Sequence, residues 1–185
     1  DVLMFCKENN MNIMIEIKPQ QFLFDCCLSI TKLVAKYNME DNVYVASFSP
    51  MALLYIRYFT NNICTGYLFT GSATTNLRAE LIRQNLPIPF LVNNALTSWA
   101  IDSSLRALAH PWMLWLCGNS MVIPQHTFIS SFNVDQYRKS GLTVLTWTVN
   151  DDVIQKYLFE NIGMTIITDY PTKRHVLSGS DVLYK

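Results

Sequence analysis

The run GLTVLTWTVN at residues 141–150, followed by GMTIITDYP at residues 163–171, decides the fold of this chain. Each run is apolar and rich in β-branched residues, which is typical of a strand in a parallel sheet that is buried on both faces. Between the two runs, Asp151 can cap a helix that extends through Glu160, and Gly163 can end it. This order predicts parallel strands with helices outside them.

Similar units precede this block along the chain. We expect strands over residues 12–17, 43–48, 63–69, 142–149 and 164–168, and helices over residues 21–37, 51–59, 74–84, 98–116 and 133–140. Ser49 and Pro50 are suited to the N-cap and first position of their helix. On helix 21–37, helical spacing predicts one apolar face, made by Phe22, Cys26, Ile30, Leu33, Val34 and Tyr37. Five or six strands fit either an open doubly wound sheet or part of an eight-stranded barrel, and periodicity alone does not choose.

The composition is apolar and electrically balanced. The 185 residues include 14 basic and 14 acidic side chains, which argues against a nucleic-acid partner because such proteins need a basic surface. Mean hydropathy is +0.16, which fits either a domain close to a membrane or a fragment whose apolar faces pack against other elements. Five cysteines without a CxxC pair predict neither a zinc site nor a disulfide framework, and we expect Cys26 and Cys27 to pack within a helix.

Residues 111–123 form the longest apolar stretch and contain Trp112 and Trp115. The stretch is too short to span a bilayer. It fits a buried helix end followed by a strand, or a segment that contacts a membrane interface through its two tryptophans.

Two charged residues lie at the end of the first predicted strand. Glu16 and Lys18 are two positions apart, so their side chains point to one face, while Ile13, Ile15 and Ile17 point to the other. Burying such a pair is costly unless the charges meet each other or a ligand. One interpretation is a carboxylate for a hard cation and an ammonium for a phosphate oxygen, and the other is an internal salt bridge.

Other candidates are weaker. Strand alternation would place Trp147 and Val149 on one face, and Trp147 could form a pocket wall or simply belong to the core. Asp169 could support a site, although we favour a capping role for the segment after Pro171. The histidines, which lie outside the motifs at strand ends, are not expected to be catalytic: His110, His126 and His175.

Taken in order, five motifs resemble the glycerophosphodiester phosphodiesterase family. They are IEIKP (15–19), ASFSP (46–50), TGYLF (65–69) and the two blocks that end in WTVN and ITDYP. The resemblance covers residues 12–171. The stretch LWLCG at residues 114–118 is similar to the membrane-anchored animal branch of the family, whose substrates include glycerophosphoinositol and N-acyl glycerophosphoethanolamines.

The resemblance implies an α/β fold, a (β/α)8 TIM barrel that is incomplete here, with residues 1–185 forming a single partial domain. It implies metal-dependent hydrolysis of glycerophosphodiesters to glycerol 3-phosphate and an alcohol, with Mg²⁺ or Ca²⁺ as the cation. On the matching positions, Glu16 would be a metal ligand, and Lys18 and Trp147 would bind substrate. The implied mechanism is general acid–base displacement at phosphorus.

The family's HRG, PENT, E-x-D and HD motifs, with its catalytic histidines, would precede IEIKP and are absent from this chain. We therefore expect the chain alone to bind metal weakly and to lack turnover, because Glu16 is one ligand where a divalent ion wants about six. The expected partners are a glycerophosphodiester or lysophospholipid-type substrate, a membrane surface and a second copy bound through an open sheet edge. The expected location is membrane-associated, or otherwise cytoplasmic. The alternative is a non-catalytic truncated barrel that acts as a binding or membrane-associated interaction protein.

Overall fold

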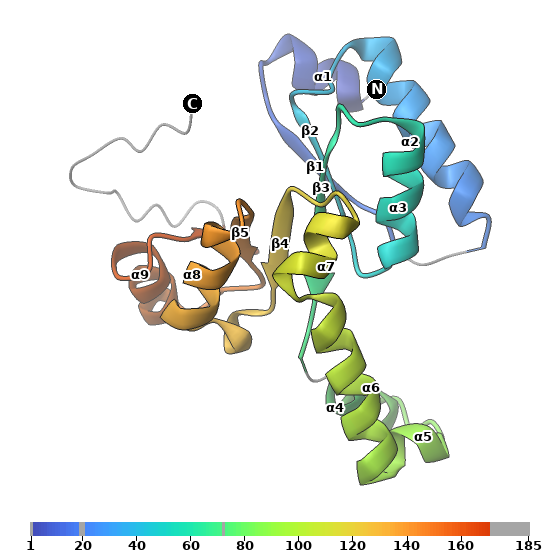
Figure 1. The fold of residues 1–185 in the computed structure, drawn as a ribbon, viewed down its shortest axis with the longest axis vertical. Helices are drawn as coiled ribbons and strands as arrows, with labels where there is room; N and C mark the ends of the chain where they lie inside the picture. Colours follow the sequence, from blue (N-terminus) through green and yellow to red (C-terminus); the bar gives the residue numbers. More distant parts are fainter. Residues whose placement is uncertain (1, 19–20, 72, 171–185) are drawn as a thin grey trace.

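A computed structural model describes residues 2–18, 21–71 and 73–170 of the chain. One sheet forms its centre, helices lie beside that sheet, and α4, α5 and α6 project away from it (Figure 1). The strands are β1 (Ile13–Glu16), β2 (Val43–Ser47), β3 (Cys64–Phe69), β4 (Met121–Pro124), β5 (Thr143–Thr146) and β6 (Thr165–Ile166). The helices are α1 (Val2–Glu8), α2 (Leu23–Tyr37), α3 (Pro50–Phe59), α4 (Ala73–Arg83), α5 (Phe90–Asn93), α6 (Ala95–Leu108), α7 (Pro111–Leu116), α8 (Ser131–Lys139) and α9 (Asp152–Glu160), with a short 3₁₀ turn, η1, at His126–Phe128.

The strand order settles the architecture. The six strands pair in chain order, from β1 to β6, and every neighbouring pair is parallel. A doubly wound sheet reverses its order at a switch point, whereas a barrel wall adds each new strand on the same side. The fold is therefore a half-barrel, and the open-sheet alternative is excluded.

The sheet carries a separate apolar cluster on each face. Val45 belongs to the large cluster beneath the helices, while its neighbour Ala46 belongs to a smaller cluster on the other face. This alternation follows from the two-residue period of a strand. The smaller cluster also contains Leu68, Met121 and Ile123, and it fills the concave side of the half-barrel.

Most helix ends lie where local sequence predicts them. The Ser49 hydroxyl accepts a hydrogen bond from the Ala52 amide, and Pro50 opens α3. The Asp151 carboxylate accepts bonds from the amides of the second and third residues of α9 at 2.9 and 3.0 Å. Gly163 has a φ of 66°, a conformation that glycine adopts without strain.

The predicted apolar face of α2 is partly wrong. Phe22 is 77% exposed and Leu33 is 45% exposed, whereas Cys27 and Val34 are fully buried. The face that meets α3 lies one residue further along, where the Cys27 thiol reaches the Ala52 carbonyl at 3.6 Å. Phe22 precedes the helix in a left-handed conformation, so it does not follow the helical spacing.

In the described residues between β3 and β4, all regular elements are helices. These helices are α4 to α7, including the short α5, which the sequence pattern does not predict. Residues 84–89 separate α4 from α5. Nowhere in the described residues is there a helix with both the length and the apolar character required to cross a bilayer.

Candidate functional site at the carboxyl edge of the sheet

The first strand presents an ion pair at its carboxyl end. The Lys18 ammonium donates to the Glu16 carboxylate at 2.8 Å, and the two side chains are 78% and 39% exposed. Ile17, between them, is buried on the helical side, as predicted, and its amide is bonded to the Ala46 carbonyl. The predicted salt bridge therefore forms, but it is not internal, because the pair faces solvent on the concave side.

Trp147 packs on the concave face, at the same carboxyl edge of the sheet. Its indole N–H donates to the Ile123 carbonyl at 2.9 Å, and its ring meets Phe48 edge to face, with centroids 5.3 Å apart. Phe48 directly follows β2 and Trp147 directly follows β5, so the contact passes over β3 and β4. In a flat sheet, three strand spacings would separate the two residues by roughly 14 Å. The contact therefore depends on the curvature of the half-barrel.

The predicted shared face of Trp147 and Val149 is wrong. Trp147 packs with the concave cluster, whereas Val149 is 1% exposed and belongs to the core beneath the helices. Regular pairing of β5 ends at Thr146, whose hydroxyl donates to the Pro124 carbonyl at 2.8 Å. The two-residue alternation still holds at Trp147, which shares a face with Leu145 and forms an isolated parallel bridge with Gln125, and it breaks before Val149.

Asn150 joins the ends of β5 and β6. Its side-chain amide donates to the Asp169 carboxylate at 2.8 Å, and its side-chain oxygen accepts from the Asp169 backbone amide at 3.0 Å. Asp169 therefore acts on the neighbouring loop, while the capping role after Pro171 lies outside the described residues. Sequence reasoning missed this pair, although two polar residues at the ends of adjacent parallel strands were a usable signal.

His126 was also missed as a residue of this edge. It directly follows Gln125 at the end of β4, and its backbone amide donates to the Trp147 carbonyl at 2.9 Å. Its Nδ1 atom is buried without a hydrogen-bond partner in the described part of the chain. By contrast, His110 is exposed beside Trp112 before α7, and His175 lies outside the described residues.

The sequence profile of the Glycerophosphoryl diester phosphodiesterase family matches residues 1–173. The chain belongs to this family. The family resemblance expected from the five motifs is confirmed.

Among curated relatives, this phosphodiesterase-family chain is 25% identical over 176 residues to glycerophosphodiester phosphodiesterase 1 of Bos taurus, and 23% identical over 172 residues to that of Homo sapiens. Each alignment covers 89% of this chain and 48% of the relative. The chain thus spans about half the length of the curated relatives it matches.

Solved structures of the family share the fold. A glycerophosphodiester phosphodiesterase from Parabacteroides distasonis superposes with a TM-score of 0.65 at 16% identity, over 92% of this chain and 59% of that one. An Oleispira antarctica phosphodiesterase, solved with the product sn-glycerol-3-phosphate, gives 0.64 at 18% identity, over 92% and 56%. These likenesses confirm the incomplete TIM barrel.

The donor atoms at this edge do not complete a divalent-cation site. Within residues 2–18, 21–71 and 73–170, no three His, Cys, Asp or Glu side chains gather closely enough to hold a metal ion. Glu16 supplies one carboxylate, and that carboxylate already accepts from Lys18. A cation of the Mg²⁺ or Ca²⁺ type needs about six oxygen ligands, so Glu16 alone does not fit the implied cation.

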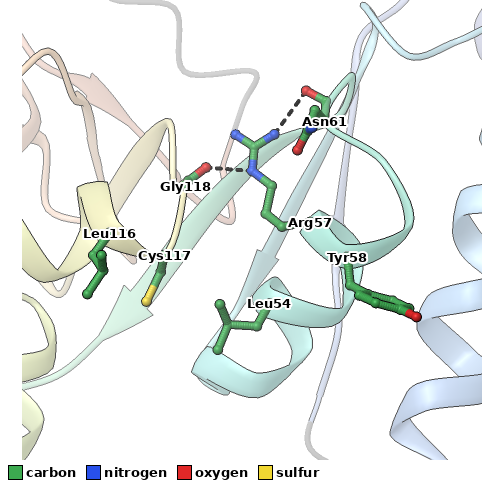
Figure 2. A pocket seen from close by; sticks show the side chains of 7 residues that line it. All are labelled: Leu54, Arg57, Tyr58, Asn61, Leu116, Cys117 and Gly118. Carbon is green, nitrogen blue, oxygen red and sulfur yellow. Dashed lines mark hydrogen bonds between the residues drawn. The ribbon is translucent and has the colours of Figure 1, made fainter.

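A pocket of about 610 Å³ lies elsewhere, between α3 and the end of α7 (Figure 2). Its centre is Arg57, whose guanidinium donates to the carbonyl oxygens of Gly118 and Asn61. Since Arg57 is near the end of α3, which leads into β3, the pocket belongs to the amino-terminal side of the sheet. We therefore interpret it as a junction between α3 and α7, separate from the candidate site. It is lined by Leu54, Arg57, Tyr58, Asn61, Leu116, Cys117 and Gly118.

Proposed function

We propose that this chain forms part of a glycerophosphodiester phosphodiesterase that releases glycerol 3-phosphate and an alcohol. The observation that carries the proposal is the placement of Glu16, Lys18 and Trp147 at the carboxyl edge of a parallel half-barrel, which is where barrel enzymes keep their sites. Membership in the family and the product named in the Oleispira antarctica structure support this substrate class.

Each of the three residues has a role that its surroundings support. The Lys18 ammonium is 78% exposed, so it can turn from Glu16 to a phosphate oxygen without leaving a buried partner. Trp147 is held by a hydrogen bond and by Phe48, which suits a fixed wall beside a glycerol or head group. Glu16 would supply one ligand of Mg²⁺ or Ca²⁺, and the remaining ligands would come from residues other than those described.

The test starts with the transcript, read upstream of Asp1. If HRG, PENT and E-x-D segments precede it in frame, the encoded protein is expected to release glycerol 3-phosphate from glycerophosphodiesters when given Mg²⁺ or Ca²⁺. Glu16→Gln should abolish that release, and Phe132→Ser, an exposed change on α8, should preserve it. Retention of full activity in Glu16→Gln would contradict the proposed ligand.

The isolated 185-residue chain provides a second test. We expect weak cation binding by titration calorimetry and no release of glycerol 3-phosphate, because one carboxylate does not complete the site. Measurable turnover by this chain alone would show that its own residues suffice for catalysis.

A non-catalytic binding protein is the second candidate. The observation that favours it is the sheet edge, because β1 and β6 each pair with a single neighbouring strand in the described structure. Unpaired strand edges recruit other strands, which makes self-association through the open edge the natural consequence. A start codon just before Asp1 and a concentration-dependent dimer in sedimentation would support this candidate, and a monomer at all concentrations would contradict it.

A further inference from the structure

A polar pair lies at the carboxyl edge of the sheet, near Trp147. Thr70 directly follows β3, and Gln125 directly follows β4. The Thr70 hydroxyl donates to the Gln125 Oε1 atom at 2.7 Å. The two segments remain side by side at this point, because the Gln125 backbone amide donates to the Phe69 carbonyl at 3.0 Å. The pair thus stands at the ends of the two middle strands of the half-barrel.

The Gln125 side chain lies on the concave face. Gln125 forms an isolated parallel bridge with Trp147, and residues paired in this way point to the same face of a sheet. Trp147 packs with the concave cluster, and so does Ile123, two positions before Gln125. Alternation along β4 and the bridge to Trp147 therefore agree. Gln125 faces the same side of the sheet as Glu16 and Lys18.

The amide of Gln125 keeps its N–H donors for another group. Its oxygen accepts from Thr70, so the Nε2 atom with its two N–H groups is the open end of the side chain. Within residues 2–18, 21–71 and 73–170, this Nε2 atom donates no hydrogen bond, yet it is not buried. The donors therefore reach the open side of the concave face.

The turns that carry the pair hold each other in place. Gly71, next to Thr70, lies so close to the Phe128 ring that a Cβ atom at this position would overlap it. The turn after β3 thus packs directly against the turn after β4. A polar group that binds a ligand selectively needs such support, because its orientation must be fixed before the ligand arrives.

The chemistry of an amide suits a neutral oxygen of a ligand. A phosphate is better matched by the charged Lys18 ammonium, whereas a hydroxyl can accept a hydrogen bond from a neutral N–H. In a flat sheet, the three strand spacings between β1 and β4 would be roughly 14 Å. The curvature that brings Trp147 against Phe48 shortens this separation, and the long side chains of Lys18 and Gln125 cover part of the rest.

We propose that Gln125 binds a hydroxyl of the glycerol group and makes the site select phosphate esters that carry hydroxyls. This role rests on the proposed function, because it takes the phosphate to lie against Lys18. Gln125 contacts the ligand, whereas Thr70 is a positioning residue that fixes which end of the amide faces it. An ester without hydroxyls leaves the amide without its ligand partner, which is the physical basis of the selection.

The test compares sn-glycerol 3-phosphate with n-propyl phosphate, which has the same charge and the same number of carbons but no hydroxyl. Each compound is titrated into the ¹⁵N-labelled 185-residue chain, and its Kd is measured by NMR. We expect the native chain to bind glycerol 3-phosphate about threefold to tenfold more tightly, which is the range of one net hydrogen bond. Gln125→Leu should weaken glycerol 3-phosphate binding alone, so that the two Kd values become equal.

Three further variants separate the roles of the residues. Thr70→Ser keeps the hydroxyl and should keep the preference for glycerol 3-phosphate, whereas Thr70→Val should reduce it, because the amide loses its fixed orientation. Lys18→Met should weaken both compounds by the same factor, since both carry the phosphate. The control is Phe132→Ser, an exposed change on α8, which should leave both Kd values unchanged.

Circular dichroism confirms that each variant is folded, and Gln125→Met, which keeps the length of the side chain, replaces Gln125→Leu if the latter unfolds. Equal Kd values in the native chain, no saturable binding of glycerol 3-phosphate, or a preference that survives in the Gln125 variant would overturn the proposal. The ratio of Kd values does not depend on turnover. Failure of the longer encoded protein to release glycerol 3-phosphate would therefore count against the proposed function separately.

Discussion

Breaking the Glu16–Lys18 ion pair is expected to cost little folding free energy. The Nζ–Oε1 distance is 2.8 Å, which corresponds to an attraction of about 1.5 kcal/mol between unit charges in water. Water is the appropriate medium because the two side chains are 78% and 39% exposed. Ordering two long side chains offsets much of the attraction, so we expect a coupling free energy of about 0.2–1 kcal/mol.

Urea unfolding of the native chain, Glu16→Gln, Lys18→Met and the double variant closes a cycle that isolates this coupling. Glu8→Gln on α1 controls for the loss of a surface carboxylate. A coupling above about 3 kcal/mol would mean that the pair is desolvated, and would refute the reasoning. A small coupling means that these charges add little to stability and remain available to a phosphate or a cation.

Three further predictions concern packing and pH. Gly66→Ala places a Cβ 2.8 Å from the Ile123 Cδ1 atom. We expect the free energy of unfolding in urea to fall by about 1–3 kcal/mol, and Ile123→Val to restore part of it because that change removes Cδ1. If Ile123→Val restores nothing, the clash is with another residue. Trp147→Phe removes the N–H bonded to the Ile123 carbonyl and should cost about 1 kcal/mol in the same assay, whereas an unchanged midpoint would argue against that bond. Burial raises the pKa of Tyr137 from 10.0 to about 12. The contribution of the neutral Tyr137 to the free energy of unfolding is therefore complete below pH 10 and is lost as the pH rises from 10 to 12. The loss is up to about 1.4 kcal/mol per pH unit. Burial, with the nearby Cys26, raises the pKa of Cys27 from 9.0 to about 11, and burial also raises the pKa of Tyr67. The Tyr137→Phe curve should therefore keep the fall from pH 9 to 11 and show a smaller fall above pH 10; a curve identical to the native one would contradict the assignment.

The features that local sequence predicts well are those that depend on neighbouring residues. Ser49 and Asp151 cap their helices as expected, because a cap uses a side chain and amides two or three positions away. The orientation of α2 shows the limit of that reasoning. Its spacing indicates an apolar stripe, but the contact with α3 decides which residues are buried, and it favours Cys27 over Phe22.

The same limit applies to the candidate site. Alternation along β1 is enough to place Glu16 and Lys18 on one face, and the pair is found there. Alternation holds at Trp147 but fails for Val149, because the strand ends before Val149 and no local pattern marks that end. The bond between Asn150 and Asp169 joins two loops 19 residues apart in the chain, so it depends on the pairing of β5 with β6.

The sequence by itself therefore determined the family, the succession of parallel β-α units and the residues that stand at the strand ends. The tertiary structure alone decided between a half-barrel and an open sheet, because strand order depends on which distant segments pair. It also brought Trp147 against Phe48 across two intervening strands. That contact exists because the sheet curves, and curvature arises from the packing of all six strands together.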